Sequence, residues 1–237
     1  MSDTISVIIP TYQHASTIAQ CLDSVLSQTR SADEVIVVDD GSTDATSTVL
    51  LPYANQIRVI TQANQGAPTS RNNGFAQSHG SLVIFCDADV IMKPTMLAEL
   101  EVALQKNPDS AYAYSSFKWG WKLFKSFPFG DGSRLKKMNF IHTSALIRRT
   151  AFPGFDPVLK RFQDWDLWLT MLVRGKRGVF VDRVLFKVIE EDRPERMSTW
   201  LPSLIIRFPW RCFGWKPKRV KKYEDAKQII LKKHHLL

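Results

Sequence analysis

The chain has 237 residues, a formal net charge of +9 and 44% hydrophobic residues, which is enough for one domain with a sizeable core. Its longest apolar run is much shorter than the roughly 18 residues of a membrane-spanning helix, and its start does not resemble a signal peptide, so we expect a cytoplasmic protein. The three widely spaced cysteines, Cys21, Cys86 and Cys212, match neither a disulfide framework nor a zinc site.

Charge is distributed unevenly along the chain. Residues 1–115 carry 5 Lys and Arg against 12 Asp and Glu, whereas residues 116–237 carry 27 against 11. The two parts therefore have net charges of −7 and +16. This asymmetry indicates that one part handles a metal and that the other meets an anionic partner: nucleic acid, a membrane surface or the phosphates of a substrate.

The chain begins with a predicted strand–helix unit. Residues 5–10 form an apolar run that predicts a strand ending at Pro10. Ser16 then stands where a helix cap is expected. The helix after it has apolar residues on one face, namely Ile18, Leu22, Val25 and Leu26.

A second unit repeats this arrangement and adds acidic residues. Residues 35–38 predict a buried strand, Asp39 and Asp40 follow at its carboxyl end, and Asp44 is expected to cap the next helix. A carboxylate at such a strand end can accept a hydrogen bond from a ribose or a base N–H, and we favour this role for Asp39. A capping turn with solvated acids explains Asp44 and is an alternative for Asp40.

The third predicted strand, residues 58–61, is followed by a glycine turn and by Pro68 at an expected helix start. Arg71 lies in the first turn of that helix, where its forked guanidinium suits a diphosphate or a base carbonyl. An ion pair with a neighbouring Asp is the alternative. Neither a P-loop nor a dinucleotide-binding glycine motif occurs in the sequence, so a nucleotide must be held in another way.

Residues 82–85 form a continuous apolar run that ends in the carboxylates of Asp87 and Asp89. Such a run predicts a strand buried on both faces, and ligands bind beyond the carboxyl ends of these strands. The two carboxylates supply hard oxygen ligands for Mg²⁺ or Mn²⁺, which would in turn hold phosphates. The alternative is a polar turn that leads into a helix opened by Pro94.

Four motifs in this order, SVIIPTYQ, VVDDGSTD, NQGAPTSRNNG and FCDAD, resemble those of the family-two glycosyltransferases with the GT-A fold. The resemblance covers roughly residues 5–190. It implies that the first three motifs bind the nucleotide of a sugar-nucleotide donor and that the Asp-x-Asp motif places a metal on its diphosphate. Many relatives have a further acid after this motif, whereas Val90 stands here, which leaves the metal affinity open.

The resemblance also implies individual roles. The base pocket would be lined by Pro10, Thr11 and Tyr12. Asp39 would bond the base, with Asp40 beside it, and Arg71 would complete that end of the site. Asp87 would approach the ribose, and Asp89 would bind the metal.

Residues 117–137 mix aromatic and cationic side chains after another predicted strand, residues 111–117. The aromatic residues are Phe117, Trp119, Trp121, Phe124, Phe127 and Phe129. Stacking on bases or sugars and anchoring at a membrane interface would all use this composition. A flap that folds onto the core with solvated lysines is the alternative.

A strand at residues 141–147 and an amphipathic helix that starts near Gln163 are predicted next. The resemblance places a Glu-Asp pair here, and its Asp is the general base that deprotonates the acceptor hydroxyl. Gln163 replaces the Glu, and Asp164 matches the base. Asp166 is interpreted as mainly structural, and it joins Asp156 and Trp165 as a candidate for acceptor contact.

Residues 178–182 and 184–189 predict two further strands, after which the histidine of many relatives is absent. We expect a catalytic domain at residues 1–197 and a basic, aromatic-rich helical extension at residues 198–237. Residues 200–215 are apolar but interrupted by prolines, so they could lie in the interface of an anionic membrane, with basic side chains on the headgroups. The alternative is that they pack on the domain. His234 and His235 are expected to be solvated.

These patterns predict an α/β protein with a mixed, mainly parallel Rossmann-like sheet flanked by helices. The function that the resemblance implies is a metal-dependent, inverting glycosyltransferase, using Mn²⁺ or Mg²⁺ and a UDP-sugar, in polysaccharide or lipopolysaccharide synthesis. Its acceptor would be a saccharide or a lipid-linked saccharide. The alternative is a non-catalytic basic module for nucleic acid or anionic surfaces, which would not need the acids of the motifs, and we expect no nucleic acid partner.

Overall fold

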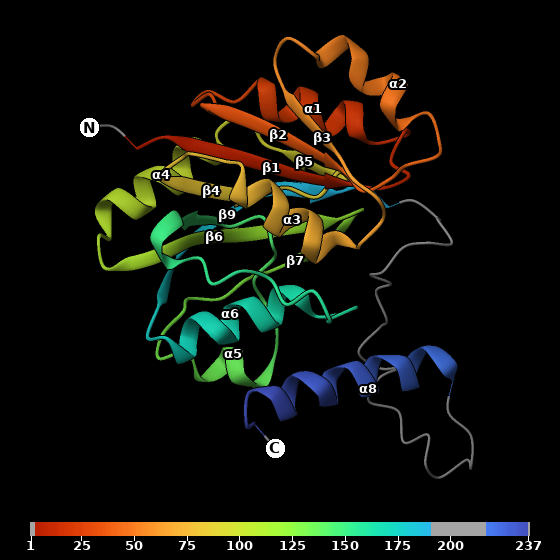
Figure 1. Cartoon of the computed structure of the whole chain (residues 1–237). Coiled ribbons are helices and arrows are strands. Elements are labelled where there is room, and N and C mark those ends of the chain that lie inside the picture. The colour runs from red at the N-terminus through yellow and green to blue at the C-terminus, as the bar shows by residue number, and fades with distance from the viewer. Residues whose placement is uncertain (1–2, 191–216, 237) are drawn as a thin grey trace.

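The computed structural model describes residues 3–190 and 217–236, which form a mixed sheet with helices on both faces (Figure 1). Within these residues the strands are β1 (Ile5–Thr11), β2 (Glu34–Asp39), β3 (Arg58–Thr61), β4 (Leu82–Phe85), β5 (Val90–Met92), β6 (Ser110–Trp119), β7 (Lys122–Phe124), β8 (Leu146–Arg148) and β9 (Arg177–Val188). The helices are α1 (Ile18–Leu26), α2 (Thr46–Leu50), α3 (Ala67–Ala76), α4 (Met96–Lys106), α5 (Ser133–Lys137), α6 (Gln163–Val173) and α8 (Lys218–Lys233), with short 3-10 turns at Leu51–Tyr53 and Arg149–Ala151.

The sheet has the strand order β3-β2-β1-β4-β8-β6-β9-β5, with β7 paired to β6. Strand β1 pairs in parallel with both β2 and β4, and β2 pairs in parallel with β3. These parallel strands end at the same edge of the sheet, so Thr11, Asp39 and the residues after Phe85 are brought together there. The predicted α/β class with a mixed sheet is therefore confirmed.

Beyond β4 the bounds of the strands differ from those predicted from the sequence. The strand predicted at residues 141–147 is shorter, because only Leu146–Arg148 pair with β4 and β6. The two strands predicted at 178–182 and 184–189 form the single strand β9. Its register against β6 shifts between Val181 and Val184, so the polar residues between them form a bulge rather than a break.

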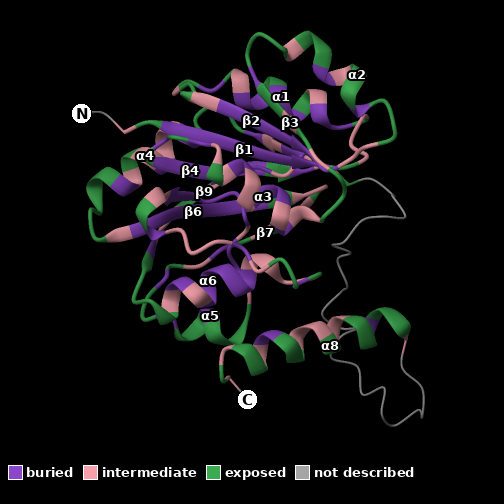
Figure 2. Cartoon of the chain, in the orientation of Figure 1, coloured by how far each residue is buried: buried purple, intermediate pink, exposed green. Residues whose placement is uncertain are grey.

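Two apolar cores lie on opposite faces of the sheet. Successive side chains of a strand point to opposite faces, and accordingly Val7 packs in the core under α1 and α4, while Ile8 packs in the core of α6. Figure 2 shows that the central strands are buried, as predicted from their continuous apolar runs. Helix α3 packs on the same face as Ile8 and Val38, which its Gly74 approaches closely.

Two helix starts differ from the prediction. Helix α1 begins at Ile18 with Thr17 at its N-cap, so Ser16 is not the cap. Helix α4 begins at Met96, two residues after Pro94, and its N-cap is Thr95. In contrast, α3 does begin around Pro68, as the sequence indicates.

Helix α8 lies beside α5 and α6 in Figure 1. Its Ile230 is fully buried in the core that contains Trp165 and Trp168. At its end His234 bonds the Asp166 carboxylate at 2.7 Å and is largely buried, so the prediction of a solvated His234 is wrong. The predicted boundary at 197/198 and residues 200–215 lie outside the described residues. Among the helices of the described part, none is both long and apolar enough to span a membrane.

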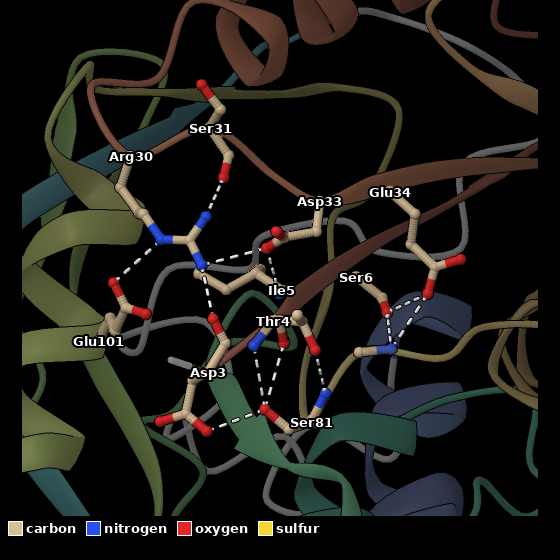
Figure 3. Close-up of polar contacts among 11 residues, drawn as sticks. Asp3, Thr4, Ile5, Ser6, Arg30, Ser31, Asp33, Glu34, Ser81 and Glu101 are labelled. Atoms are coloured by element: carbon tan, nitrogen blue, oxygen red, sulfur yellow. Dashed lines mark hydrogen bonds and ion pairs between the residues drawn. The ribbon is translucent and has the colours of Figure 1, made fainter. Parts of the chain in front are cut away.

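A polar network closes the opposite edge of the sheet, at the start of β1 (Figure 3). Arg30 bonds Asp33 at 3.0 Å and Glu101 at 3.2 Å, and so joins the segment between α1 and β2 to α4. Glu34 accepts hydrogen bonds from Ser6 and from the N–H groups of residues 79 and 80. These contacts fix the ends of β1 and β2 away from the edge where the acidic residues gather.

We predict that Gly74→Ala destabilises the fold. In an exposed helix this change gains up to about 1 kcal/mol in helix propensity. Here the added methyl group would lie 2.5 Å from Ile8 Cγ2 and 3.0 Å from Val38 Cγ2, and such overpacking costs typically about 1–3 kcal/mol. Urea unfolding should therefore show a lower midpoint for the variant. A raised midpoint would mean that α3 is not seated tightly on β1.

Candidate active site

A cleft of about 860 Å³ opens at the carboxyl ends of β1 and β4 and extends to the start of α6. Of the residues predicted to form the site, those that line it are Pro10, Thr11, Tyr12, Asp40, Arg71, Asp87, Asp89, Asp164 and Trp165. Asp39, Asp156 and Asp166 are not in its lining. Most of the predicted nucleotide, metal and base residues thus meet in one cleft.

Asp40 shapes the edge of the cleft by holding the loop before α3. Its carboxylate accepts hydrogen bonds from Gln62 Nε2 and from the backbone N–H groups of Gln65 and Gly66, at 2.7–2.9 Å. Gly66 has φ +89°, a conformation that suits glycine and aims its N–H at this carboxylate. Asp39 is buried and accepts a hydrogen bond from Ser42 N at 3.0 Å.

The first motif supplies one wall of the cleft. Thr11 is buried, and in the part of the chain that the structure describes its Oγ1 has no hydrogen-bond partner. A buried hydroxyl without a partner is costly unless something else bonds it. Tyr12 is partly exposed beside it, so its ring is available to a planar group.

Arg71 is the best-buried cation of the cleft, with only 5% of its surface exposed. Its guanidinium donates to Asp87 Oδ1 at 2.7 Å and to Gln163 Oε1 at 2.9 Å, which joins α3, the end of β4 and the start of α6. Its Nε is buried without a partner among the described residues. Burial opposes ionisation of Asp87, but the charge and hydrogen bond of Arg71, together with His142 and His14, outweigh it and lower the pKa of this carboxyl.

Asp89 lies two residues further along the cleft and can bind a cation. Within the described ranges, no three His, Cys, Asp or Glu side chains gather as a metal-binding cluster. Mg²⁺, however, is usually held by one or two carboxylates with substrate phosphates and waters. Asp89 lines the same cleft as the Arg71–Asp87 pair, so its carboxylate is placed to join such an ion beside a diphosphate.

Asp164 stands in the first turn of α6. Its Oδ2 accepts a hydrogen bond from Asn139 Nδ2 at 2.6 Å, and its Oδ1 accepts one from Trp165 N at 2.8 Å. Burial raises the pKa of the Asp164 carboxyl, although His142 and these donors favour its charged form. A carboxylate with a raised pKa is better matched to proton abstraction near neutral pH.

His142 and Asn139 are cleft residues that sequence reasoning missed. The His142 ring packs 5.0 Å from the rings of Phe117 and Phe186, and its Nδ1 accepts a hydrogen bond from Ser144 N. Burial lowers the pKa of this imidazole, while Asp87 and Asp164 pull it the other way. Its neutral form therefore carries the proton on Nε2. The segment looked like an ordinary strand, so no local signal marked either residue.

The three candidates for acceptor contact, Asp156, Trp165 and Asp166, all make contacts within the protein. Asp156 and Asp166 both bond Lys233 Nζ, at 2.6 and 2.9 Å, and so clamp the end of α8. Trp165 is 2% exposed and donates its ring N–H to Leu135 O at 2.7 Å. Asp166 is structural, as expected, while the acceptor roles of Asp156 and Trp165 find no support in these contacts.

Residues 117–137 have features of both predicted arrangements: some aromatic side chains fold onto the core, and others are available to a ligand. Phe117 stacks on Phe124 and Phe186 and belongs to the core, as a folded flap would require. Several of the aromatic side chains also line the cleft, whereas Trp121, at the turn between β6 and β7, is 88% exposed. The segment is therefore part of the cleft wall with an exposed tip.

Comparison with known proteins shows which proteins this chain is similar to. The family model "Glycosyl transferase family 2" matches residues 6–155. A Nostoc sp. protein named "Uncharacterized glycosyltransferase alr2836" is 42% identical over 105 residues, which cover 43% of this chain and 33% of that protein. The chain thus matches about a third of the length of such curated relatives.

Solved structures share the fold. S. aureus TarS 1–349 in complex with UDP-GlcNAc has a TM-score of 0.69 at 22% identity, covering 84% of this chain and 62% of TarS. The mannosyltransferase PcManGT from Pyrobaculum calidifontis, in complex with GDP-Man and Mn²⁺, has a TM-score of 0.62 at 20% identity, covering 97% and 70%. The expected GT-A fold and the expected family are both confirmed.

We predict that Arg71→Met lowers the stability by roughly 3 kcal/mol at pH 7, because it leaves the Asp87 carboxylate without its partner. In the wild type the pKa of Asp87 is lowered on folding, so its contribution is present above about pH 4 and lost as the pH falls through the folded value. In the variant both contributions of Arg71 are lost, so burial prevails and raises that pKa. The stability difference should therefore shrink between pH 7 and pH 3.

The matched control is Arg71→Met combined with Asp87→Asn, in which no carboxylate remains to titrate. Urea unfolding at pH 7 and pH 3 should give the double variant a free energy of unfolding that differs from wild type. This difference should depend less steeply on pH than that of the single variant. An equal loss in the single variant at pH 3 and pH 7 would contradict the ion-pair explanation.

Proposed function

The chain belongs to glycosyl transferase family 2, and we propose that it transfers a sugar from a nucleoside diphosphate donor to an acceptor hydroxyl, with inversion at the anomeric carbon. One observation carries this proposal: the Arg71–Asp87 pair, Asp89 and Asp164, which come from three separate segments, line the same cleft. A basic module that only binds polyanions would not need these acids together.

The donor is proposed to enter along the first motifs. Pro10, Thr11 and Tyr12 line that end of the cleft, and the free hydroxyl of Thr11 supports a polar ligand there. Asp39 is proposed to bond the base and Asp40 to keep the adjoining loop in place. TarS is crystallised with UDP-GlcNAc and PcManGT with GDP-Man, so the fold holds either base, and uridine is our proposal from the resemblance.

The diphosphate would lie between Arg71 and Asp89, with Asp87 near the ribose. Arg71 is a fixed cation whose Nε can still donate. Mn²⁺ or Mg²⁺ held by Asp89 would neutralise charge that develops on the leaving diphosphate. Mn²⁺ is present in the PcManGT complex, which supports a divalent ion in this fold.

Asp164 is proposed as the general base. It removes the acceptor proton while the hydroxyl oxygen forms its bond to the anomeric carbon and the bond to the diphosphate breaks. A single displacement of this kind inverts the configuration. The raised pKa of this carboxyl and its place in the cleft support the assignment. We propose polysaccharide or lipopolysaccharide synthesis as the setting, with an anionic membrane surface as a partner of residues 198–237.

We predict that Asp89→Asn weakens binding of UDP mainly when Mn²⁺ is present, because the amide cannot supply a charged ligand to the ion. Thermal stabilisation by UDP with and without Mn²⁺ measures this directly. Glu99→Gln, an acid of α4 outside the cleft lining, is the control and should respond as wild type. If Asp89→Asn keeps the full effect of the metal, Asp89 does not bind it.

We predict that Asp164→Asn lowers turnover by about 10²–10⁴ while UDP binding stays close to wild type, since a base acts on the acceptor. In the wild type, kcat/KM should rise with pH through the raised pKa of Asp164, because only the charged carboxylate accepts the proton. Asn139→Leu removes a donor to that carboxylate and should move this rise to higher pH. An unchanged pH profile in Asn139→Leu, or normal turnover in Asp164→Asn, would remove Asp164 from the mechanism.

A further inference from the structure

We propose that the acceptor of this enzyme carries a phosphate group, which Arg161 and Lys227 bind beside the general base. The inference rests on the proposed function and adds the class of its acceptor. It also assigns helix α8, which lies outside the region matched by the family model, to the binding site.

The first observation is a set of cations in the lining of the cleft, which we call the cationic wall. Five basic side chains line it in addition to Arg71, namely Lys125, Lys137, Lys160, Arg161 and Lys227. Within residues 3–190 and 217–236, none of the five forms an ion pair. Arg161 and Lys227 are half-buried, whereas the other three are exposed, so these two have already lost part of their hydration before a ligand enters.

The lining of the cleft has six Lys and Arg side chains against four Asp side chains, so its acids do not balance the cations. Asp40 is satisfied by its loop, Asp87 by Arg71, and Asp164 accepts from Asn139 and Trp165 N. The donor diphosphate is accounted for by Arg71 and the metal at Asp89. The cations near α6 and α8 are therefore left for an anionic group that is not part of the donor.

The second observation is that α8 is held in place on this wall. Tyr223 also lines the cleft and packs its ring edge against Phe162, with centroids 5.2 Å apart. Lys227 is four residues further on and so lies on the same face of the helix. Ile230 is buried in the core, and Lys233 is clamped by Asp156 and Asp166. The two acids named as candidates for acceptor contact thus fix the end of α8 instead.

Position and charge together indicate the kind of acceptor. Arg161 precedes Asp164 by three residues, and both line the cleft, so an anion held by Arg161 would lie close to the hydroxyl that Asp164 deprotonates. A phosphate ester has up to two charges and several acceptor oxygens, which suits one guanidinium and one ammonium group. The acceptor is therefore a hydroxyl compound with a nearby phosphate, either soluble or part of a lipid headgroup.

The test measures binding of inorganic pyrophosphate to the full chain by calorimetry at low salt, with UDP and Mn²⁺ present to fill the donor site. Arg161→Gln/Lys227→Gln should weaken binding by about tenfold for each cation removed, because a hydrogen bond to a charged group contributes about 1.5–3 kcal/mol. The control is Arg174→Gln/Lys232→Gln, which removes one Arg near α6 and one Lys of α8, both exposed and outside the cleft lining. It should bind as wild type.

Two further arms identify the source of the phosphate. Soluble glycerol 3-phosphate and vesicles of phosphatidylglycerol in phosphatidylcholine offer the same chemistry in free and lipid form, and glycerol is the neutral reference. Weaker binding of either one in Arg161→Gln/Lys227→Gln than in the control supports the proposal and names the source. Equal binding by these two variants of all three phosphate probes would overturn it.

The outcomes separate this inference from the proposed function. If UDP binds and a sugar is transferred, but glycerol and glycerol 3-phosphate serve equally well, the phosphate site is wrong and the transferase stands. If UDP does not bind, the donor assignment fails, and the difference between the two double variants toward pyrophosphate still tests the cationic wall.

Discussion

The buried charge of Arg71 is the constraint on which the rest of the cleft depends. A guanidinium that is 5% exposed must be paired, and its two partners come from the end of β4 and the start of α6. The ion pair therefore sets the position of α3 relative to both. The resemblance leads one to expect Glu at position 163, where Gln stands. Gln163 keeps the hydrogen bond without a second negative charge, so Asp87 alone balances Arg71.

The charge of Arg71 also makes the two carboxylates Asp87 and Asp164 differ in pKa. Asp87 touches Arg71 and has a lowered pKa, whereas Asp164 is buried beside neutral donors and has a raised one. Two acids in one cleft whose pKa values are pushed apart indicate two different roles. His142 lies near both and is kept from charging by burial, so it does not cancel either carboxylate at neutral pH.

Local patterns were enough to predict the first half of the fold. Strands β1, β2 and β4 are built on apolar runs, whereas β3 is short and largely exposed. The polar residues after these strands must gather at one sheet edge because the strands are parallel. The second half depends on long-range pairing. Residues 141–145 were predicted to belong to a strand, but only Leu146–Arg148 pair. His234 looked solvated because Asp166, its partner, is 68 residues away. His142 and Lys227 likewise reach the cleft through packing between segments that are far apart in the sequence.

One end of the cleft could be predicted from the sequence and the other could not, because the two ends are built differently. The end proposed for the donor consists of strand ends, whose positions are fixed by the sheet, and the family model matches it through residue 155. The other end is assembled from the segment before α6 and from α8, which is held by a few contacts around Asp156, Asp166 and Phe162. Such contacts can change without disturbing the sheet. Acceptor choice can therefore vary in a protein of this design while the handling of the donor stays the same.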